Sequence, residues 1–242
     1  MTQFCSINNN VIEYDVINMK ANSISFLIAT CLLALISCTK EAPKILIIGD
    51  SISIGYTPYV KEMLGERAYV EHNEGNAQHS GTGLEEVISW IGEEKWDIVQ
   101  FNWGLWDLAY RHEDSETQGK RDKIKGIVTF TPEQYRSNLD SLVRIIKSST
   151  KAKLLFVSTS YVPEGEKGRF VKDAPIYNKV AKEVMAEYKI PVNDLYDFSK
   201  EIHAEHSTAA NNVHYTKDGY KLLANKIIEG LAQFDSRLNE NN

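Results

Sequence analysis

Apolar and polar positions form two kinds of segment from Lys44 to the end of the chain. Short runs rich in apolar residues predict strands at 44–48, 68–72, 96–102, 153–158 and 190–195. Apolar positions recur with helical spacing over 57–66, 83–93, 132–147, 174–188 and 217–234. Strands that alternate with helices of this length pair in parallel through right-handed crossovers. We therefore predict an α/β fold, a three-layer α/β/α sandwich around a mainly parallel sheet of about five strands.

One long polar segment interrupts this alternation. Residues 110–129 carry charges of both signs and no apolar period. Loops of this length are usually functional or mobile. Open α/β proteins hold ligands at the carboxyl edge of the sheet. We expect 110–129 to be a solvated excursion near that crevice.

The amino-terminal part has a different pattern. Residues 1–18 are polar, and Met19-Lys20 is followed by a mostly apolar stretch over 24–36. A basic start and a short apolar core are typical of a secretory signal, because a membrane span needs about 20 apolar residues. The alternative is an ordinary buried or anchoring helix. We favour the signal and expect translation to start at Met19.

The sequence Leu35-Ile36-Ser37-Cys38 resembles the lipobox of bacterial lipoproteins. That resemblance implies cleavage before Cys38 and a lipid on its sulfur, which would anchor an exported protein to a membrane of the bacterial cell envelope. The predicted organisation is an upstream extension over 1–18, a signal peptide over 19–37, a tether over 38–43 and one folded domain over 44–236.

Composition and charge narrow the function of this domain. About 200 residues follow Cys38, which suffices for one domain with a sizeable core. The formal net charge of −6 argues against nucleic acid as a partner, because phosphate binding relies on clustered Lys and Arg. All three cysteines, Cys5, Cys31 and Cys38, lie at or before the predicted cleavage point. A thiol nucleophile or a disulfide within the domain is therefore excluded.

The first predicted strand ends abruptly in Gly49-Asp50-Ser51. A parallel strand that ends there places Ser51 at the carboxyl edge of the sheet, so Ser51 is a candidate nucleophile. The alternative is a turn in which Ser51 or Ser53 caps the next helix. A nucleophilic serine also needs a general base, and His214 precedes the last predicted helix, at the same edge of the sheet.

These segments resemble the SGNH, or GDSL, family of esterases and lipases. The family has Gly-Asp-Ser after the first strand, a glycine after the second, Gly-x-Asn-Asp after the third and Asp-x-x-His before the last helix. Residues 49–51 match the first block and Gly75 fits the second, while 104–107 and 211–214 fit the third and fourth in part. The resemblance spans the whole domain and implies a flavodoxin-like sandwich.

The resemblance also implies roles for individual residues. Ser51 would be the nucleophile and would supply a backbone N–H to the oxyanion hole, and His214 would be the base. Gly75 would give a second N–H, and Gly104 would lie in the third, substrate-binding block. No metal or cofactor is implied.

Two positions depart from the family pattern. Where the family has an oxyanion-binding asparagine, this chain has Trp106. Asn102, at the end of the same strand, is a candidate to supply that amide instead. The alternative is that Asn102 is a buried residue that caps the loop. Where the family has the aspartate that orients the histidine, this chain has Asn211. An amide lacks the charge that stabilises an imidazolium. The chain therefore works as a Ser-His dyad, uses another acid such as Asp194 or Asp197, or has lost activity.

Three further features of the sequence bear on metal and substrate binding. His203 and His206 have no matched third metal ligand and are expected to be surface residues. Four aromatic residues either form a platform for a sugar ring or pack under the long loop: Trp103, Trp106, Tyr110 and Tyr161. Arg169 is a candidate contact for an anionic substrate.

The predicted function is hydrolysis of a carboxylic ester by Ser51 and His214, with a short acyl group such as acetyl on a carbohydrate as the favoured substrate. Phospholipid or thioester hydrolysis is a variant of it. The alternative is a catalytically weakened envelope protein that binds a glycan or an ester without turnover.

Overall fold

A five-stranded sheet lies at the centre of the region that this computed structural model describes, residues 41–239. Its strands are β1 (Lys44–Ile48), β2 (Tyr69–His72), β3 (Ile98–Phe101), β6 (Lys153–Val157) and β7 (Val192–Asn193). The spatial order is β2-β1-β3-β6-β7, and every neighbouring pair is parallel. The predicted extension 1–18, the signal peptide 19–37 and Cys38 lie outside the described residues.

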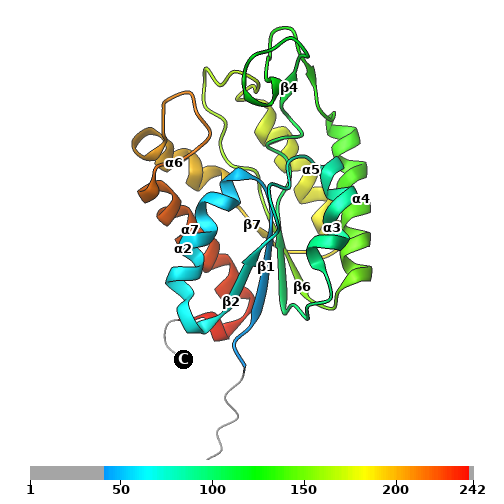
Figure 1. The fold of residues 1–242 in the computed structure, drawn as a ribbon, viewed down its shortest axis with the longest axis vertical. Coiled ribbons are helices and arrows are strands. Elements are labelled where there is room, and N and C mark those ends of the chain that lie inside the picture. The colour runs from blue at the N-terminus through cyan, green and yellow to red at the C-terminus, as the bar shows by residue number, and fades with distance from the viewer. Residues whose placement is uncertain (1–40, 240–242) are drawn as a thin grey trace, which may run out of the picture. The chain divides into compact units, whose positions relative to one another are not determined.

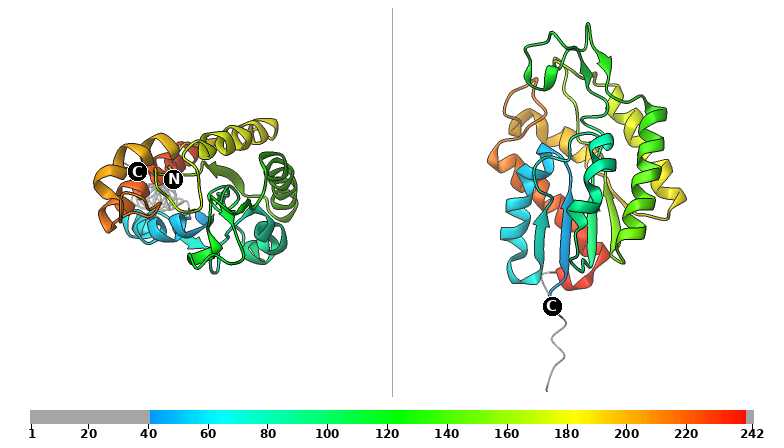
Figure 2. Two further views of the ribbon diagram at one scale, coloured as in Figure 1. Left: turned by 90° about the horizontal axis from the view of Figure 1, so that it is seen from above. Right: turned by 45° about the vertical axis from the view of Figure 1, so that its right-hand side comes forward.

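Helices cover both faces of the sheet, so the predicted three-layer α/β/α fold is confirmed (Figures 1 and 2). One face carries α2 (Ser51–Leu64), α6 (Tyr196–His206) and α7 (Lys217–Phe234). The other face carries α3 (Ser80–Ile91), α4 (Pro132–Ser149) and α5 (Asp173–Glu187). Within residues 41–239, no helix has the length and apolar character that crossing a membrane requires.

The core of this fold lies between the sheet and the two helical layers. Residues 45–48 of β1 are buried on both faces, as a central parallel strand requires. Leu223, Ile227 and Leu231 of α7 are also fully buried. Single-turn helices lie at Gly65–Arg67, Gln118–Lys120 and Ser236–Leu238.

Two helical predictions need correction. Helix α2 begins at Ser51, not at residue 57, because the Asp50 side chain accepts a hydrogen bond from Ile52 N and caps the helix there. Pro58 lies inside α2. Helix α6 was not predicted, because the side chains it buries, Ser199 and His203, are polar.

The strand order fixes where a ligand can bind. The chain leaves β1 toward β2 and later returns to the other side of β1 as β3, so connections diverge between β1 and β3. Crevices in open α/β sheets form at the carboxyl ends of strands at such a point. Residues after β1 and after β3 therefore meet there.

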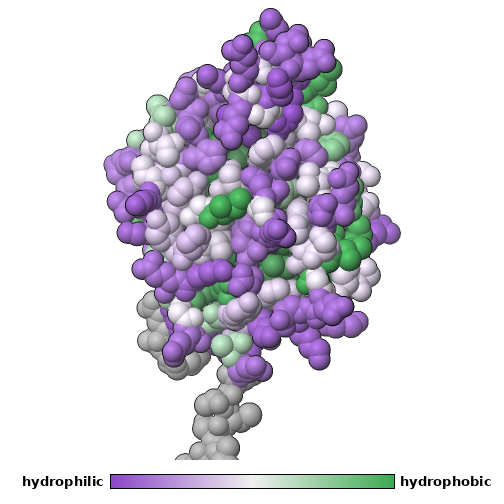
Figure 3. Space-filling view, viewed as in Figure 1, coloured by the Kyte–Doolittle hydropathy of each residue, from purple (hydrophilic) through white to green (hydrophobic). Residues whose placement is uncertain are grey.

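The predicted excursion lies over this edge of the sheet. It contains the antiparallel strands β4 (Tyr110–Arg111) and β5 (Ile127–Val128). Backbone hydrogen bonds from Tyr110 N to Gly168 O and from Lys123 N to Lys167 O join it to the loop after β6. Figure 3 shows mainly hydrophilic side chains at this end of the molecule, although Ile124 and Ile127 are exposed.

Candidate active site

Ser51 is the first residue of α2, directly after the turn that ends β1. A Cβ on Gly49 would lie 2.7 Å from Ser53 Oγ, so the turn requires glycine. Asp50, rather than Ser51 or Ser53, is the helix cap. The Ser51 N–H makes no hydrogen bond with another described residue, as expected for the first turn of a helix. This donor is therefore available to a ligand next to the Ser51 hydroxyl.

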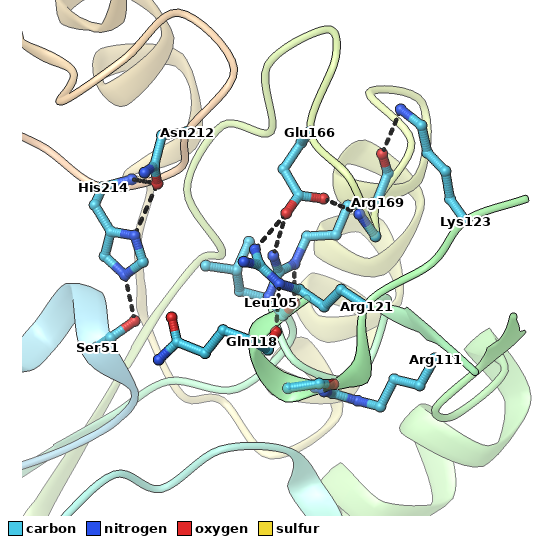
Figure 4. Close-up of polar contacts among 12 residues, drawn as sticks. Ser51, Leu105, Arg111, Gln118, Arg121, Lys123, Glu166, Arg169, Asn212 and His214 are labelled. Atoms are coloured by element: carbon cyan, nitrogen blue, oxygen red, sulfur yellow. Dashed lines mark hydrogen bonds and ion pairs between the residues drawn. The ribbon is translucent and has the colours of Figure 1, made fainter. Parts of the chain in front are cut away.

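The fold brings Ser51 to His214, 163 residues further along the chain. Ser51 Oγ lies 2.9 Å from His214 Nε2, and His214 Nδ1 lies 2.9 Å from Asn212 Oδ1 (Figure 4). The same Oδ1 accepts the His214 backbone N–H, at 3.1 Å, so it is an acceptor. The proton is thus assigned to Nδ1, which leaves Nε2 free to accept the Ser51 proton.

Asn212, not Asn211, holds the imidazole, so the predicted role of Asn211 needs correction. Asn212 caps a turn two residues ahead of His214, and its backbone N–H donates to Ala209 O at 2.9 Å. His203 Nε2, 2.8 Å from Asn212 O, supports the turn from below. Asn211 is exposed and makes no side-chain hydrogen bond with another described residue. The turn at Asn212, rather than the three-residue spacing of the family's Asp-x-x-His pattern, therefore determines which side chain reaches His214.

No carboxylate replaces the missing aspartate among the described residues. Asp194 accepts from Ser158 Oγ at 2.8 Å and pairs with Lys182. Asp197 lies in the first turn of α6 and has no hydrogen bond to His214. The constellation at this edge is therefore Ser51, His214 and Asn212.

Among the predicted oxyanion donors, the role of Asn102 needs correction. Asn102 Nδ2 donates to Val157 O at 2.6 Å, and Asn102 lines a separate small cavity, so it does not supply the amide of the family asparagine that Trp106 replaces. Gly75 is exposed and lines a hollow on the surface of the molecule. Gly104 has φ +142°, and its Cβ position lies 2.3 Å from Thr159 Oγ1, so it allows the close approach of two loops.

The cavity beside Ser51 has a volume of about 90 Å³. Asn76, Leu105 and Trp106 line it together with Ser51 and His214. Asn76 Oδ1 accepts from Gln78 N at 2.8 Å, and no described residue accepts from the Asn76 amide nitrogen. This donor was missed, although its position directly after Gly75 was a signal for it.

Three arginines also line this cavity. Arg111 and Arg121 come from the excursion and Arg169 from the loop after β6 (Figure 4). One buried carboxylate, Glu166, pairs with Arg121 and Arg169. Burial lowers the pKa of His214 from its ordinary value, and Arg169 and Arg121 lower it further. His214 is thereby kept neutral, as a base must be.

Other predicted candidates lie elsewhere. His203 is buried rather than on the surface, and it contacts the rings of Tyr161 and Tyr215. Among residues 41–239, no three His, Cys, Asp or Glu side chains are grouped to hold a metal ion. The aromatic residues do not form one platform, because Trp103 is buried and donates to Ala77 O, whereas Trp106 lines the cavity.

Comparisons with known proteins place this geometry in context. Residues 47–222 match the family described as GDSL-like lipase/acylhydrolase. A lipase/acylhydrolase from Enterococcus faecalis has a similar structure, with 24% identity and a TM-score of 0.64, over 83% of this chain and 99% of that one. An acetylxylan esterase from Geobacillus stearothermophilus, Axe2, has 18% identity and a TM-score of 0.61, over 79% and 94%. The acetyl xylan esterase AlAXEase has 14% identity and a TM-score of 0.61, over 77% and 98%. No curated protein matches this chain by sequence.

Proposed function

This chain belongs to the GDSL-like lipase/acylhydrolase family, and from that premise we propose that it hydrolyses a short-chain carboxylic ester, with Ser51 as nucleophile. The observation that carries the proposal is the 2.9 Å hydrogen bond between Ser51 Oγ and His214 Nε2, with Nδ1 held by Asn212. A nucleophile, its base and the group that orients the base therefore form one chain of contacts.

The reaction follows from these contacts. Ser51 Oγ attacks the ester carbonyl carbon while its proton passes to His214 Nε2. The resulting oxyanion is stabilised by the Ser51 N–H and the Asn76 amide nitrogen, two donors that have no hydrogen-bond partner among the described residues. His214 then returns the proton to the leaving alcohol, which completes an acyl-enzyme. Water, deprotonated by His214, attacks the acyl carbon and releases the acid and free Ser51.

The cavity favours a small acyl group. A volume of about 90 Å³ next to Ser51 has room for a group of a few atoms, which suits acetyl. Two of the structural neighbours, AlAXEase and Axe2, are acetyl xylan esterases. An acetyl group on a carbohydrate is therefore the favoured substrate.

The weakened binding protein is the second candidate, because Asn212 supplies no charge. Asn212 Oδ1 nevertheless fixes the tautomer that leaves Nε2 as acceptor, so the base is correctly prepared. A neutral partner slows a serine hydrolase without removing its mechanism. We therefore favour slow turnover over binding alone.

The decisive experiment is hydrolysis of phenyl acetate by the natural protein, Ser51→Ala and Ser148→Ala. Ser148 is an exposed serine on α4 and serves as the matched control. Activity should fall by at least about 10⁴-fold in Ser51→Ala and persist in the control. Equal activity in Ser51→Ala would exclude Ser51 as nucleophile. Phenyl decanoate should react far more slowly than phenyl acetate; the reverse would contradict the acyl-size argument.

We also propose that the full chain is exported and carries a lipid on Cys38, on the evidence of Leu35-Ile36-Ser37-Cys38. Expression of the full chain in a bacterium with labelled palmitate should label the natural protein but not Cys38→Ser. Equal labelling of both proteins would contradict the proposal.

A further inference from the structure

Three guanidinium groups surround the cavity that holds Ser51 Oγ. Arg111, Arg121 and Arg169 line it, and Glu166 is the carboxylate that pairs with two of them. If these groups are ionised, the wall carries a net charge of about +2 in a molecule whose formal charge is −6. A local excess of positive charge against an acidic background indicates that the wall is built to receive an anion.

Each of these arginines has one side-chain nitrogen that makes no hydrogen bond with the described residues. Arg169 donates from Nε to Leu105 O at 2.6 Å and from Nη1 to Glu166 at 3.0 Å. Arg121 donates from Nε to Gln118 O at 2.9 Å and from Nη1 to Glu166. Nη2 of both residues has no hydrogen-bond partner among residues 41–239. Arg169 is only 3% exposed, and its Nη2 is not among the fully buried unpaired atoms of the described residues, so this nitrogen faces the open part of the cavity.

Arg111 repeats this arrangement. Its Nε donates to Thr129 Oγ1 at 3.0 Å and its Nη1 to Gly119 O, while its Nη2 is buried without a described partner. The guanidinium carbon lies 4.7 Å from the centre of the Trp106 ring, which fixes the plane of the group. No carboxylate pairs with Arg111 among the described residues. Arg111 therefore adds positive charge to the wall without a direct ion pair, while the Asp107 and Glu166 carboxylates act on it at longer range.

The arginines are also held in place before any ligand arrives. Glu166 is 1% exposed and binds Arg121 and Arg169 together, and it also accepts from Gly168 N at 2.7 Å. Figure 4 shows Gln118, from the same segment as Arg121, with its amide directed toward Ser51. Trp106, which stands where the family has an asparagine, therefore packs against the Arg111 guanidinium at the cavity.

We propose that the ester hydrolysed at Ser51 carries an oxyanion group, a carboxylate or a sulfate, which binds Nη2 of Arg121 and Arg169 next to Arg111. This inference rests on the proposed function, because it names the substrate class of the same cavity. Arginine presents paired donors that match the geometry of a carboxylate or sulfate oxygen pair. The bound anion also places a negative charge near His214, which has no aspartate to stabilise its imidazolium.

Three acetate esters with the same acyl group and related phenol leaving groups test the inference. They are 3-acetoxybenzoate, 3-acetoxybenzenesulfonate and the neutral 3-acetoxybenzamide. We expect kcat/KM of the natural protein for at least one anionic ester to exceed that for the amide at least tenfold. In Arg121→Gln, a change at a partly exposed residue, this ratio should fall at least fivefold. Arg136→Gln is the matched control, because it removes the same charge on α4, where Arg136 pairs with Glu183 and Glu187.

Binding separates this inference from the proposed function. Ser51→Ala binds the esters without hydrolysing them, and calorimetry should give a Kd at least tenfold lower for an anionic ester than for the amide. Equal Kd values, or equal kcat/KM values in the natural protein, would overturn the oxyanion site. Selective binding without hydrolysis by the natural protein would overturn the proposed function and retain the site. A preference for benzoate identifies a carboxylate, and a preference for the sulfonate identifies a sulfate-like group.

Discussion

The identity of the residue that orients His214 can be tested with one pair of substitutions. Asn212→Asp keeps an oxygen acceptor for both the backbone N–H and the Nδ1–H of His214, and it adds a negative charge. Asn211→Asp adds the same charge at the adjacent, exposed position, where the family pattern places the acid. The two variants therefore have the same net charge and differ only in contact with the imidazole.

The magnitude follows from the 2.9 Å distance between Asn212 Oδ1 and His214 Nδ1. Unit charges about 4 Å apart interact by about 4 kcal/mol at an effective dielectric constant of about 20. Burial of the new carboxylate offsets part of this energy, so we expect the His214 pKa to rise by about 1 to 2 units. One unit corresponds to about 1.4 kcal/mol. The imidazolium that forms during acyl transfer is stabilised similarly, so kcat should rise about 10-fold to 100-fold in Asn212→Asp.

The assay is the pH dependence of kcat/KM for phenyl acetate between about pH 4 and pH 9. In Asn212→Asp the acid limb should move to higher pH and the plateau should rise. In Asn211→Asp both should change far less, because a charge on an exposed side chain is screened by solvent. A larger gain in Asn211→Asp than in Asn212→Asp would refute the assignment of Asn212.

Two further predictions use other parts of the structure. The acid limb of the pH profile of the natural protein should lie below pH 6.5, because burial, Arg169 and Arg121 lower the His214 pKa. Arg121→Gln removes one of these effects and should move the acid limb to higher pH. An unchanged limb would show that Arg121 does not act on His214. Gly104→Ala should destabilise the fold by about 2 kcal/mol or more, because its φ is +142° and the added Cβ would lie 2.3 Å from Thr159 Oγ1. Gly65→Ala is the control: its φ is also positive, but nothing lies within 4 Å, so urea unfolding should show a smaller loss, about 1 kcal/mol. Equal losses in the two variants would contradict the steric argument.

Most of the fold follows from local patterns. The bounds predicted for β1, 44–48, are those observed, because a central parallel strand is a continuous apolar run. The last helix also has its predicted bounds, because Thr216 caps it and its apolar stripe continues to its end. Helix α6 lacks such a stripe, since its buried residues, Ser199 and His203, are polar. Their burial depends on hydrogen bonds to Tyr161 N and Asn212 O, which a periodicity cannot reveal.

The candidate site divides in the same way. Ser51 and His214 were predictable, because Ser51 begins the helix after β1 and His214 lies in the loop before α7, and the parallel topology places both at one edge of the sheet. The side chains between elements were not predictable from spacing. Asn102 donates to Val157 O, and Asn212 rather than Asn211 contacts His214. The direction of a loop side chain depends on the backbone angles of each residue and on distant partners.

Local patterns along the chain were sufficient to predict the layers, the family and the two residues that meet at the carboxyl edge of the sheet. Its hydrophobic periodicity specifies which elements form, and parallel connections leave few ways to arrange them. The contact between Asn212 and the imidazole, and the convergence of Arg111, Arg121 and Arg169 on the cavity, became apparent only in the folded molecule. These arginines lie on two separate loops and are brought together by Glu166, by Trp106 and by backbone hydrogen bonds between the loops. Such contacts are non-local, so no pattern along the chain encodes them.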